Sequence, residues 1–493
     1  MLKPLAKDGW NYETAAHLLN RAGFGGPPEE IARLTDLGHD AALSSLLDFE
    51  KIPDPTPNPV WAVPDLGRAE RLKTIQSMAP EARRQAQQVE QRAQAQRIIE
   101  LRGWWLDRMA RGPRPFQEKM VLFWHGHFAT SYEKVRDGYY MWRQNELFRR
   151  LAADYWLRLL IEAGRDPAML IWLDQAQSRK EHPNENYARE VMELFTLGEG
   201  HYTEKDVTEG ARALTGWSLD RDAQRFIYRP ALHDTGEKTF LGLTGNLNGE
   251  DVMAQIVAQP QAAVFITGKL WNFFAGQMPS PELNQALGDA FIENARHFKP
   301  FLRVMFRSEE FYSEAVLRNQ VKSPVQWLVG TARMLQCELP PAFISAAITR
   351  SLGQDLFAPP NVKGWDGGVT WITTNTLLER YNDAATLVQG TTQQLSASDF
   401  ALKPGGPGGI VQERAAQRVH IGGVDVDKIL TPGERADKGK LVASLQHRLL
   451  QSTLSNKQDQ ALRDFLDSHT NLNEADIRNV IRLVMSTPEY QVT

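Results

Sequence analysis

Hydrophobic residues recur along this chain mainly at helical spacing, and the stretch 184–217 shows the pattern most clearly. On a helix drawn at about 100° per residue, the apolar side of 186–195 carries Tyr187, Val191, Leu194 and Phe195. The roughly opposite side carries Asn186, Arg189, Glu190 and Glu193. We therefore expect a helix that buries its apolar side and presents an amide, a guanidinium and two carboxylates on the other.

A second helix is predicted directly after the first. Asn184 is placed to cap the first helix, and two glycines favour its end before residue 201. Thr203 and Asp206 have the spacing of a capping box, which marks the start of the second helix. Arg212 lies on the polar side of that helix, and Trp217 follows its end.

Helical spacing dominates the rest of the chain, so we expect a mainly α protein, a multi-helix globular bundle. One long amphipathic helix of about 30 residues is predicted from Pro80 to Arg111. Alternation and turn residues predict a small β-hairpin or irregular lobe around 225–245.

The same pattern predicts three parts along the chain. A main helical domain spans 1–390 and includes a proline-rich strap at 52–64 and the small lobe at 218–250. Glycine and proline are frequent between 391 and 435, which indicates a linker or irregular loop. A C-terminal helical unit at 436–493 is expected to pack on the main domain.

Composition narrows the classes of function. The 493 residues are 42% hydrophobic, which is enough for a large core, and the formal net charge is only −4. A general nucleic-acid role therefore has no electrostatic support, and the arginines of 80–111 are interleaved with Glu and Gln as on a solvated face. The single cysteine, Cys337, excludes an internal disulfide framework.

No run approaches the ~18 apolar residues that a membrane span requires. The start of the sequence lacks the apolar core of a secretory signal, so we expect a cytoplasmic protein. An exported protein whose targeting segment has been removed is the alternative. The sequence carries no signal for an oligomeric state.

His125 and His127 form the second candidate for chemistry. An H-x-H pair in an extended or turn segment directs both imidazoles to the same side, a spacing that metal sites use. The pair is equally suited to proton transfer, because imidazole titrates near neutrality. The structural alternative is two histidines packed among aromatic neighbours, each bonded to a carbonyl.

Two loops complete the candidate residues. The turn 232–238 carries His233, Asp234 and Lys238, and the loop 359–372 carries Asn361 and Trp365. Loops on rigid scaffolds frequently face ligands. An exposed polar turn and a simple helix connector are the respective alternatives.

Five separated motifs resemble the domain of unknown function 1800 family. They are HLLNRAGFGG at 17–26, FWHGHF at 123–128, the whole stretch 184–217, LHDTGEK at 232–238 and PPNVKGWDGGVTWI at 359–372. The resemblance implies a bacterial protein whose relatives are often encoded beside proteins of the sulfatase and alkaline phosphatase superfamily. Many relatives carry export signals, which this chain does not show. The resemblance supplies no agreed catalytic residues.

Two classes of function remain open. In the first, the chain is a hydrolase or lyase acting on a carbohydrate-like or anionic ester substrate, with a divalent metal as a further option. The candidate catalytic residues are His125, His127, Glu190, Glu193 and Arg189. The candidate substrate-binding residues are Asn186, Arg212, Trp217, His233, Asp234, Lys238, Asn361 and Trp365. We expect these groups to converge on a cleft between helices.

In the second class, the chain is a non-catalytic partner of a sulfatase-like or phosphatase-like enzyme. The polar cluster is then a structural network that fixes helix packing. Arg189 and Glu193 are spaced i, i+4 and suit an ordinary ion pair, and Glu190 suits a pair with Arg212. Solvent access separates the two classes, because a network is closed and a site faces a pocket.

Overall fold

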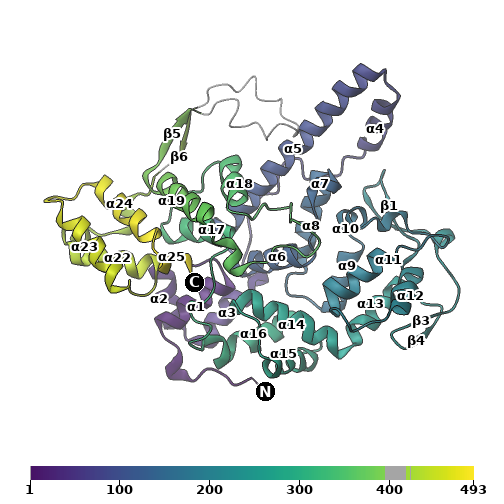
Figure 1. The fold of residues 1–493 in the computed structure, drawn as a ribbon, viewed down its shortest axis with the longest axis horizontal. Helices are drawn as coiled ribbons and strands as arrows, with labels where there is room; N and C mark the ends of the chain where they lie inside the picture. Colours follow the sequence, from purple (N-terminus) through teal and green to yellow (C-terminus); the bar gives the residue numbers. More distant parts are fainter. Residues whose placement is uncertain (1, 395–417, 422) are drawn as a thin grey trace.

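The computed structural model describes residues 2–394, 418–421 and 423–493, and these are mainly α-helical (Figure 1). The predicted fold class is therefore confirmed. Within this part of the chain, no helix combines the length and apolar character needed to cross a membrane.

The first part of the chain contains helices joined by loops. Its helices are α1 (Tyr12–Ala22), α2 (Pro28–Leu37), α3 (His39–Leu47), α4 (Arg68–Ser77), α5 (Pro80–Arg111), α6 (Pro115–His127), α7 (Tyr132–Val135), α8 (Gly138–Arg150), α9 (Trp156–Gly164) and α10 (Pro167–Trp172). Short 3-10 turns lie at Lys7–Gly9, Phe49–Lys51, Gln175–Gln177, Pro230–Leu232, Glu309–Tyr312 and Gly368–Trp371.

The middle of the chain alternates helices with short strands. It contains α11 (Glu185–Glu190), a π-helix (Val191–Thr196), α12 (Glu204–Leu214), β1 (Trp217–Asp220), β2 (Arg225–Tyr228), β3 (Lys238–Phe240) and β4 (Leu243–Gly245). The hairpin expected around 225–245 is thus two antiparallel hairpins, with Trp217 opposite Tyr228 in the first and Lys238 opposite Gly245 in the second.

The last part returns to helices. They are α13 (Gly249–Ala258), α14 (Pro260–Ala275), α15 (Pro281–Glu293), α16 (Phe298–Arg307), α17 (Pro324–Met334), α18 (Ala342–Ser351), α19 (Thr374–Gln389), α20 (Val426–Ile429), α21 (Pro432–Ala436), α22 (Lys438–Leu449), α23 (Asn456–Asp467), α24 (Glu474–Met485) and α25 (Pro488–Gln491). Strands β5 (Thr391–Gln394) and β6 (Arg418–Ile421) pair antiparallel.

Helix α6 is the centre of the core. All of its residues except Gly126 are buried, because α1, α3, α5 and α8 pack around it. Trp124 donates from Nε1 to the carbonyl of Ala152 at 2.8 Å and stacks on Trp156 at a centroid distance of 6.0 Å. A buried indole satisfied in this way fixes the helix rotationally. The cavity described below lies at the end of this helix.

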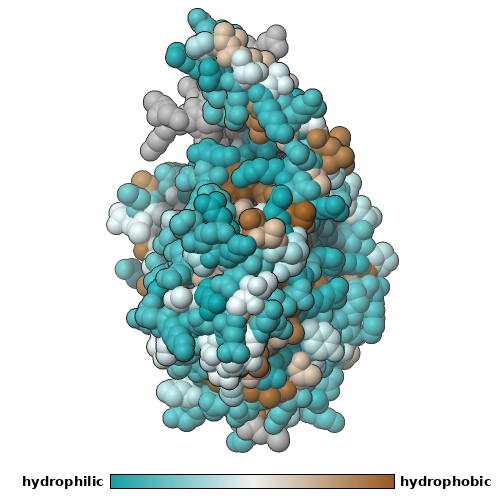
Figure 2. Space-filling view, turned by 90° about the vertical axis from the view of Figure 1, so that its right-hand side faces the viewer, coloured by the Kyte–Doolittle hydropathy of each residue, from teal (hydrophilic) through white to brown (hydrophobic). Residues whose placement is uncertain are grey.

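The long helix predicted at 80–111 is confirmed as α5. Its outer part lies beyond the core and is flanked by α4, so that the two helices form an arm that stands out from the body (Figures 1 and 2). Arg68 of α4 donates from Nε to Oε1 of Glu90 of α5 at 2.9 Å. From Gln94 onward α5 becomes increasingly buried and enters the core.

The proline-rich segment from 52 to 64 forms neither helix nor strand. It runs against α5, where the indole of Trp104 donates to the carbonyl of Pro57 at 2.8 Å. The indole of Trp61 donates to Oε2 of Glu100 at 2.7 Å. Tryptophan donors therefore hold a segment whose prolines cannot join a regular element.

The expected linker differs in part from its prediction. Residues 395–417 and 422 lie outside the described residues, but α20 and α21 form within the range 391–435. The C-terminal helices share the core of the main body. Tyr490 contacts the Thr331 hydroxyl at 2.5 Å, and Arg448 donates to the carbonyl of Met334 at 3.0 Å.

Candidate functional site

A cavity of about 330 Å³ lies where α6, α14, the start of α17 and the loop 359–372 meet. Its lining includes Lys119, Phe123, His127, Lys269, Phe273, Gln326, Lys363, Trp365, Asp366 and Trp371. A pocket of this size accommodates a small organic molecule. Of the candidate residues from the sequence, His127 and Trp365 line it, and Glu190 and Glu193 do not.

A larger open hollow of about 590 Å³ lies between α9 and α13. Its walls are mostly apolar, and none of the candidate residues from the sequence lines it. Because specific small-molecule sites combine an apolar wall with a few convergent polar groups, the smaller cavity is the better candidate.

Two residues of the cavity lining, His127 and Lys269, are bonded to the π-helix, which itself lies outside the lining. The regular α-helix expected through Glu193 ends at Glu190, and the amide of Leu197 reaches back to the carbonyl of Met192 at 2.7 Å. The carbonyls of Leu194 and Phe195 lie in the last turn, where a helix leaves its carbonyls without internal partners. Both are satisfied by side chains from other helices, as follows.

Lys269 of α14 donates from Nζ to the carbonyl of Leu194 at 2.8 Å. Its ammonium lies over the ring of Phe265, 4.7 Å from the centroid. Burial lowers the pKa of this lysine to about 8. No carboxylate of the described residues forms an ion pair with it.

Lys119 of α6 also lines this cavity. Its Nζ bonds Oε1 of Gln326 and lies over the Phe24 ring at 4.6 Å. Burial, with a further contribution from Arg21, holds the pKa of this lysine well below its usual range. Lys119 likewise has no carboxylate partner within the described part of the chain.

The described lining of the cavity therefore carries three lysines, since Lys363 adds an exposed one at the rim, against a single aspartate, Asp366. Sequence reasoning missed Lys119 and Lys269. Lys269 stands alone among apolar residues of its helix, but that pattern does not place it at a cavity, and Lys119 follows Gln117 and Glu118 as in an ordinary polar segment.

The two histidines do not point to the same side. That expectation was wrong because α6 continues through His127, and residues two apart on a helix differ by about 200° in direction. His125 is sealed in the core, where its Nε2 accepts from the amide of Phe357 at 2.9 Å. Burial, together with Arg102, lowers the pKa of His125 to about 3.

His127 faces the cavity instead. Its Nε2 donates to the carbonyl of Phe195 at 3.0 Å, so the neutral ring carries its lone pair on Nδ1. Nδ1 is buried and has no protein partner within the described residues. Burial, and then the charge of Lys269, holds the pKa of this imidazole well below its usual range. His127 is therefore a neutral acceptor beside the partly buried Lys269.

Glu190 lies near the rim. Its side chain is half-buried and forms no hydrogen bond or ion pair within the described residues. Burial and the charge of Glu193 raise its pKa, and Lys363 acts in the opposite direction. Glu190 thus lies within electrostatic reach of the cavity rim. Glu193 is occupied otherwise, because its Oε2 accepts from the Tyr202 hydroxyl at 2.8 Å.

Arg189 pairs with a residue that was not expected. Its guanidinium binds both carboxylate oxygens of Glu204, each at 2.7 Å, instead of Glu193. The hydrogen bonds that Arg189 donates to Glu204 raise the pKa of Arg189 further. Asn186 is exposed on the same helix. This pair joins α11 to α12 at the surface.

The motif 232–238 forms a closed network around Arg212. Nε of Arg212 donates to Oδ2 of Asp234 at 2.8 Å, and Nη1 donates to Glu209 at 3.0 Å, so the pair expected with Glu190 does not form. Lys238 is buried, and its Nζ donates to the carbonyl of Asp234 at 2.6 Å. His233 donates from Nδ1 to the carbonyl of Thr215 at 2.9 Å.

Trp217 is buried beneath the same lobe. A Cβ at Gly249 would lie 2.5 Å from its indole, so this glycine leaves the space that the ring occupies. The guanidinium carbon of Arg165 lies over the Trp217 ring, 5.1 Å from its centroid. The side chain therefore packs the lobe and does not face the cavity.

The loop 359–372 closes the cavity over the end of α6. Gly364 has a φ of +84°, and a Cβ there would lie 2.3 Å from the carbonyl oxygen of Gly126. Only glycine allows this approach. Trp365 faces His125 at a centroid distance of 5.7 Å, whereas Asn361 is exposed and accepts from the amide of Lys363 at 2.8 Å.

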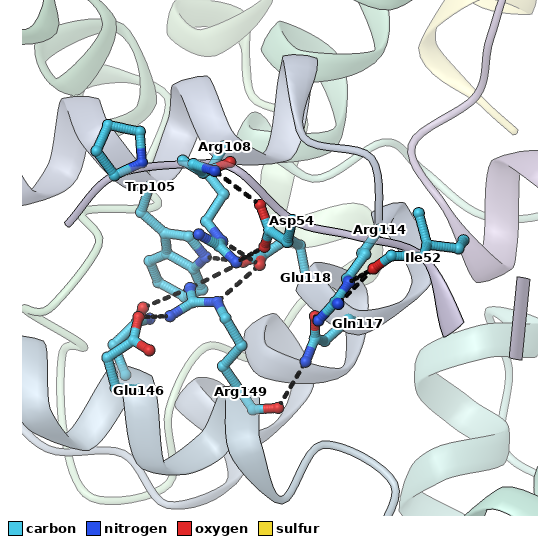
Figure 3. A network of polar contacts seen from close by, with 12 residues as sticks. Ile52, Asp54, Trp105, Arg108, Arg114, Gln117, Glu118, Glu146 and Arg149 are labelled. Carbon is cyan, nitrogen blue, oxygen red and sulfur yellow. Dashed lines mark hydrogen bonds and ion pairs between the residues drawn. The ribbon is translucent and has the colours of Figure 1, made fainter. Parts of the chain in front are cut away.

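A second polar cluster, centred on Glu118, lies deeper in the core (Figure 3). Glu118 accepts from Nε of Arg108 at 2.6 Å and from Nε of Arg149 at 2.7 Å. The indole of Trp105 donates to Oε2 at 2.9 Å, and Arg108 also pairs with Asp54 of the strap. Nothing in the sequence singles out this glutamate. Both of its carboxylate oxygens are bonded to buried donors, which indicates a structural cluster.

Within the described residues, no group of three or more His, Cys, Asp or Glu side chains is arranged to hold a metal ion. The divalent metal expected as an option from the sequence therefore has no ligand set in this part of the chain.

A family model described as "Protein of unknown function (DUF1800)" matches residues 17–492. The chain belongs to the DUF1800 family. The resemblance carried by the five motifs is thereby confirmed over nearly the whole DUF1800 chain. Searches of curated proteins and of solved structures found no match. The function of this DUF1800 protein must therefore be argued from its cavity.

Proposed function

We propose that this DUF1800 protein binds an anionic, carbohydrate-like or ester substrate in the lysine-lined cavity and acts on it as a hydrolase or lyase. The observation that carries the proposal is that Lys119 and Lys269 enter one cavity with no carboxylate partner in the described residues. Removing an ammonium from water is unfavourable unless an opposite charge compensates it. An anionic ligand supplies that charge.

The remaining walls suit the rest of such a substrate. Phe273, Trp365 and Trp371 give apolar faces, and Gln326 and Gln354 give amides that both donate and accept hydrogen bonds. Aromatic walls with a few amides accommodate a ring whose edge carries hydroxyl groups.

Two groups are placed to move protons. His127 lines the cavity, and its buried Nδ1 has no partner in the described residues; as the proposed base, this nitrogen reaches the substrate after a rotation of the ring. A bound anion raises the pKa of this imidazole, which improves it as a base near neutral pH. Glu190, whose pKa is already raised at the rim, is the proposed acid.

Anion binding also takes up protons. Because burial lowers the pKa of Lys269 to about 8, a bound anion restores the charged form, and the affinity falls as the pH rises above that value. Calorimetric titration with inorganic phosphate and sulfate at several pH values tests this. No saturable binding of any small anion overturns the proposal.

The variant Lys269→Met removes one charge at nearly constant length, and we expect it to weaken phosphate binding by about tenfold or more. Lys73→Met, on exposed α4, is the matched control and leaves the affinity unchanged. Circular dichroism and the thermal midpoint establish that both variants fold. Equal affinities in all three proteins contradict the proposed site.

The second function, a non-catalytic partner of a sulfatase-like or phosphatase-like enzyme, is favoured by one observation. Arg189, Arg212, Asp234 and Lys238 are paired among protein groups, as in a network that fixes packing. A panel of phosphate and sulfate esters separates the two. Tight anion binding without turnover of any ester favours the partner role, and turnover that is lost in His127→Gln favours the enzyme.

A further inference from the structure

Lys269 differs from an ordinary anion-binding lysine in its surroundings. It lies in α14 on an otherwise apolar stretch, between the ring of Phe265 and the carbonyl of Leu194. Its side chain remains partly accessible, and it lines the cavity. An amine that is held by one carbonyl and has no carboxylate beside it is not obliged to stay charged.

We infer that Lys269 is a covalent residue, whose amine forms an imine with the carbonyl group of an anionic aldehyde or 2-oxo acid bound in the cavity. The inference rests on the proposed function and selects its lyase branch, because an imine withdraws electrons from the neighbouring carbon. Neither the sequence motifs nor the family match assigns this residue a role.

The chemistry balances without an oxidant or reductant. The lone pair of Nζ attacks the carbonyl carbon, a carbon–nitrogen bond forms, and the carbonyl π electrons move to oxygen. The protons of the attacking nitrogen pass to that oxygen, which leaves as one water molecule. Solvent water relays these protons. His127 lies beside the reacting amine, since His127 and Lys269 bond the consecutive carbonyls of Phe195 and Leu194.

The lowered pKa supports this role. With a value of about 8, roughly a tenth of Lys269 is uncharged at pH 7, which is about two hundred times the fraction for an exposed lysine. Lys119 is less suited to attack, because its Nζ is held by Gln326 in a more deeply buried position. Lys119 instead holds the carboxylate of the ligand.

The test is reductive trapping. The intact protein is incubated at pH 7 with glyoxylate, the smallest anionic aldehyde, and sodium cyanoborohydride, and its peptides are quantified by mass spectrometry. We expect a carboxymethyl group on Lys269 in at least about tenfold excess over Lys73, which serves as the exposed reference in the same digest. Modification of Lys269 at or below the level of Lys73 overturns the inference.

Two comparisons exclude nonspecific labelling. Glycolaldehyde, a neutral aldehyde of similar size, should modify Lys269 more slowly than glyoxylate does, and inorganic phosphate should slow the glyoxylate reaction by competition. Equal rates with both aldehydes and no protection by phosphate overturn the inference. These comparisons use the unaltered protein, so they hold even where a variant fails to fold.

The variant Lys269→Arg keeps the charge and removes the nucleophile. It should bind phosphate within a few-fold of the unaltered protein and lose the adduct. In the unaltered protein, by contrast, phosphate binding without any adduct on Lys269 contradicts the covalent role and leaves the proposed function standing. Failure to bind phosphate contradicts the proposed function itself.

Discussion

Glu118 shows how strongly one buried residue depends on its partners. Burial alone would raise the pKa of this carboxyl, but Arg149 and Arg108 outweigh it and hold the pKa below its usual range. In the sequence Glu118 is one of many helical glutamates, and nothing in the spacing distinguishes it from a solvated one. Its partners come from α5 and α8, which only tertiary packing brings together.

The variant Glu118→Gln should destabilise the protein by about 3–5 kcal/mol, because it removes the buried carboxylate that Arg108 and Arg149 share and leaves each with only its less buried partner, Asp54 or Glu146. Urea unfolding followed by circular dichroism measures the change. Glu146→Gln is the matched control, since Glu146 contacts the same Arg149 but is 31% exposed, and its effect should be much smaller. Equal effects of the two substitutions contradict this account.

Asp166 is a buried carboxyl whose pKa is shifted upward, in contrast to that of Glu118. Burial raises its pKa to about 7, even though it accepts from the amides of Ala168 and Met169 and from Gln144. The folded state therefore holds a proton that the unfolded state releases near pH 4. The contribution of Asp166 is fully present below that value and is lost as the pH rises through about 7.

Asp166→Asn retains a good helix cap and removes the titration. We expect the stability of the unaltered protein relative to this variant to fall as the pH rises from about 4 to above 7. Thermal midpoints of both proteins across this range provide the measurement. A constant difference between them shows that Asp166 does not titrate in the window.

At the scale of single elements, the sequence predicts local structure well and geometry set by neighbours poorly. The Asn184 cap, the Thr203 and Asp206 capping box, and the bounds of α5 all follow from local signals and are confirmed. The π-helix does not follow from them, because its free carbonyls are satisfied by side chains of α6 and α14. The prediction for His125 and His127 was wrong for a related reason. Helix α6 continues past its apolar residues to His127, so the two imidazoles point in different directions.

The crossing of α5 and α18 depends on Gly103. A Cβ at this position would lie 2.1 Å from Cβ and 2.6 Å from Cα of Ala342. Gly103→Ala should destabilise the protein by about 1–3 kcal/mol, more than the helix propensity of alanine returns. Gly126→Ala in α6 meets open space and is the control. If the Gly103→Ala protein is more stable than the unaltered protein, α5 and α18 can move apart without losing packing free energy.

At the scale of the whole molecule, one hydrophobic cluster extends from Leu2 to Tyr490. The cavity is assembled from segments that begin near residue 119 and end near 371, and the chain between them supplies other walls. Periodicity identifies the helices but carries no information on which of them meet. That is why Trp365 and His127 could be selected from the sequence and Lys269 could not.

Because the C-terminal helices share this cluster, we expect one cooperative thermal transition instead of two. Scanning calorimetry of the full chain tests this by comparing the calorimetric and van't Hoff enthalpies. Agreement between them supports a single unit. A separate transition for 424–493 would mean that the contacts of Tyr490 and Arg448 are too weak to couple the two parts.

The arm formed by α4 and α5 affects how the molecule rotates in solution. A helix of 32 residues is about 48 Å long, and its outer part is not enclosed by the body. Drag grows steeply with distance from the axis of rotation, so a small mass at this reach slows rotation about axes across the arm more than rotation about the arm itself. In solution the protein should therefore tumble more slowly than its mass alone would give.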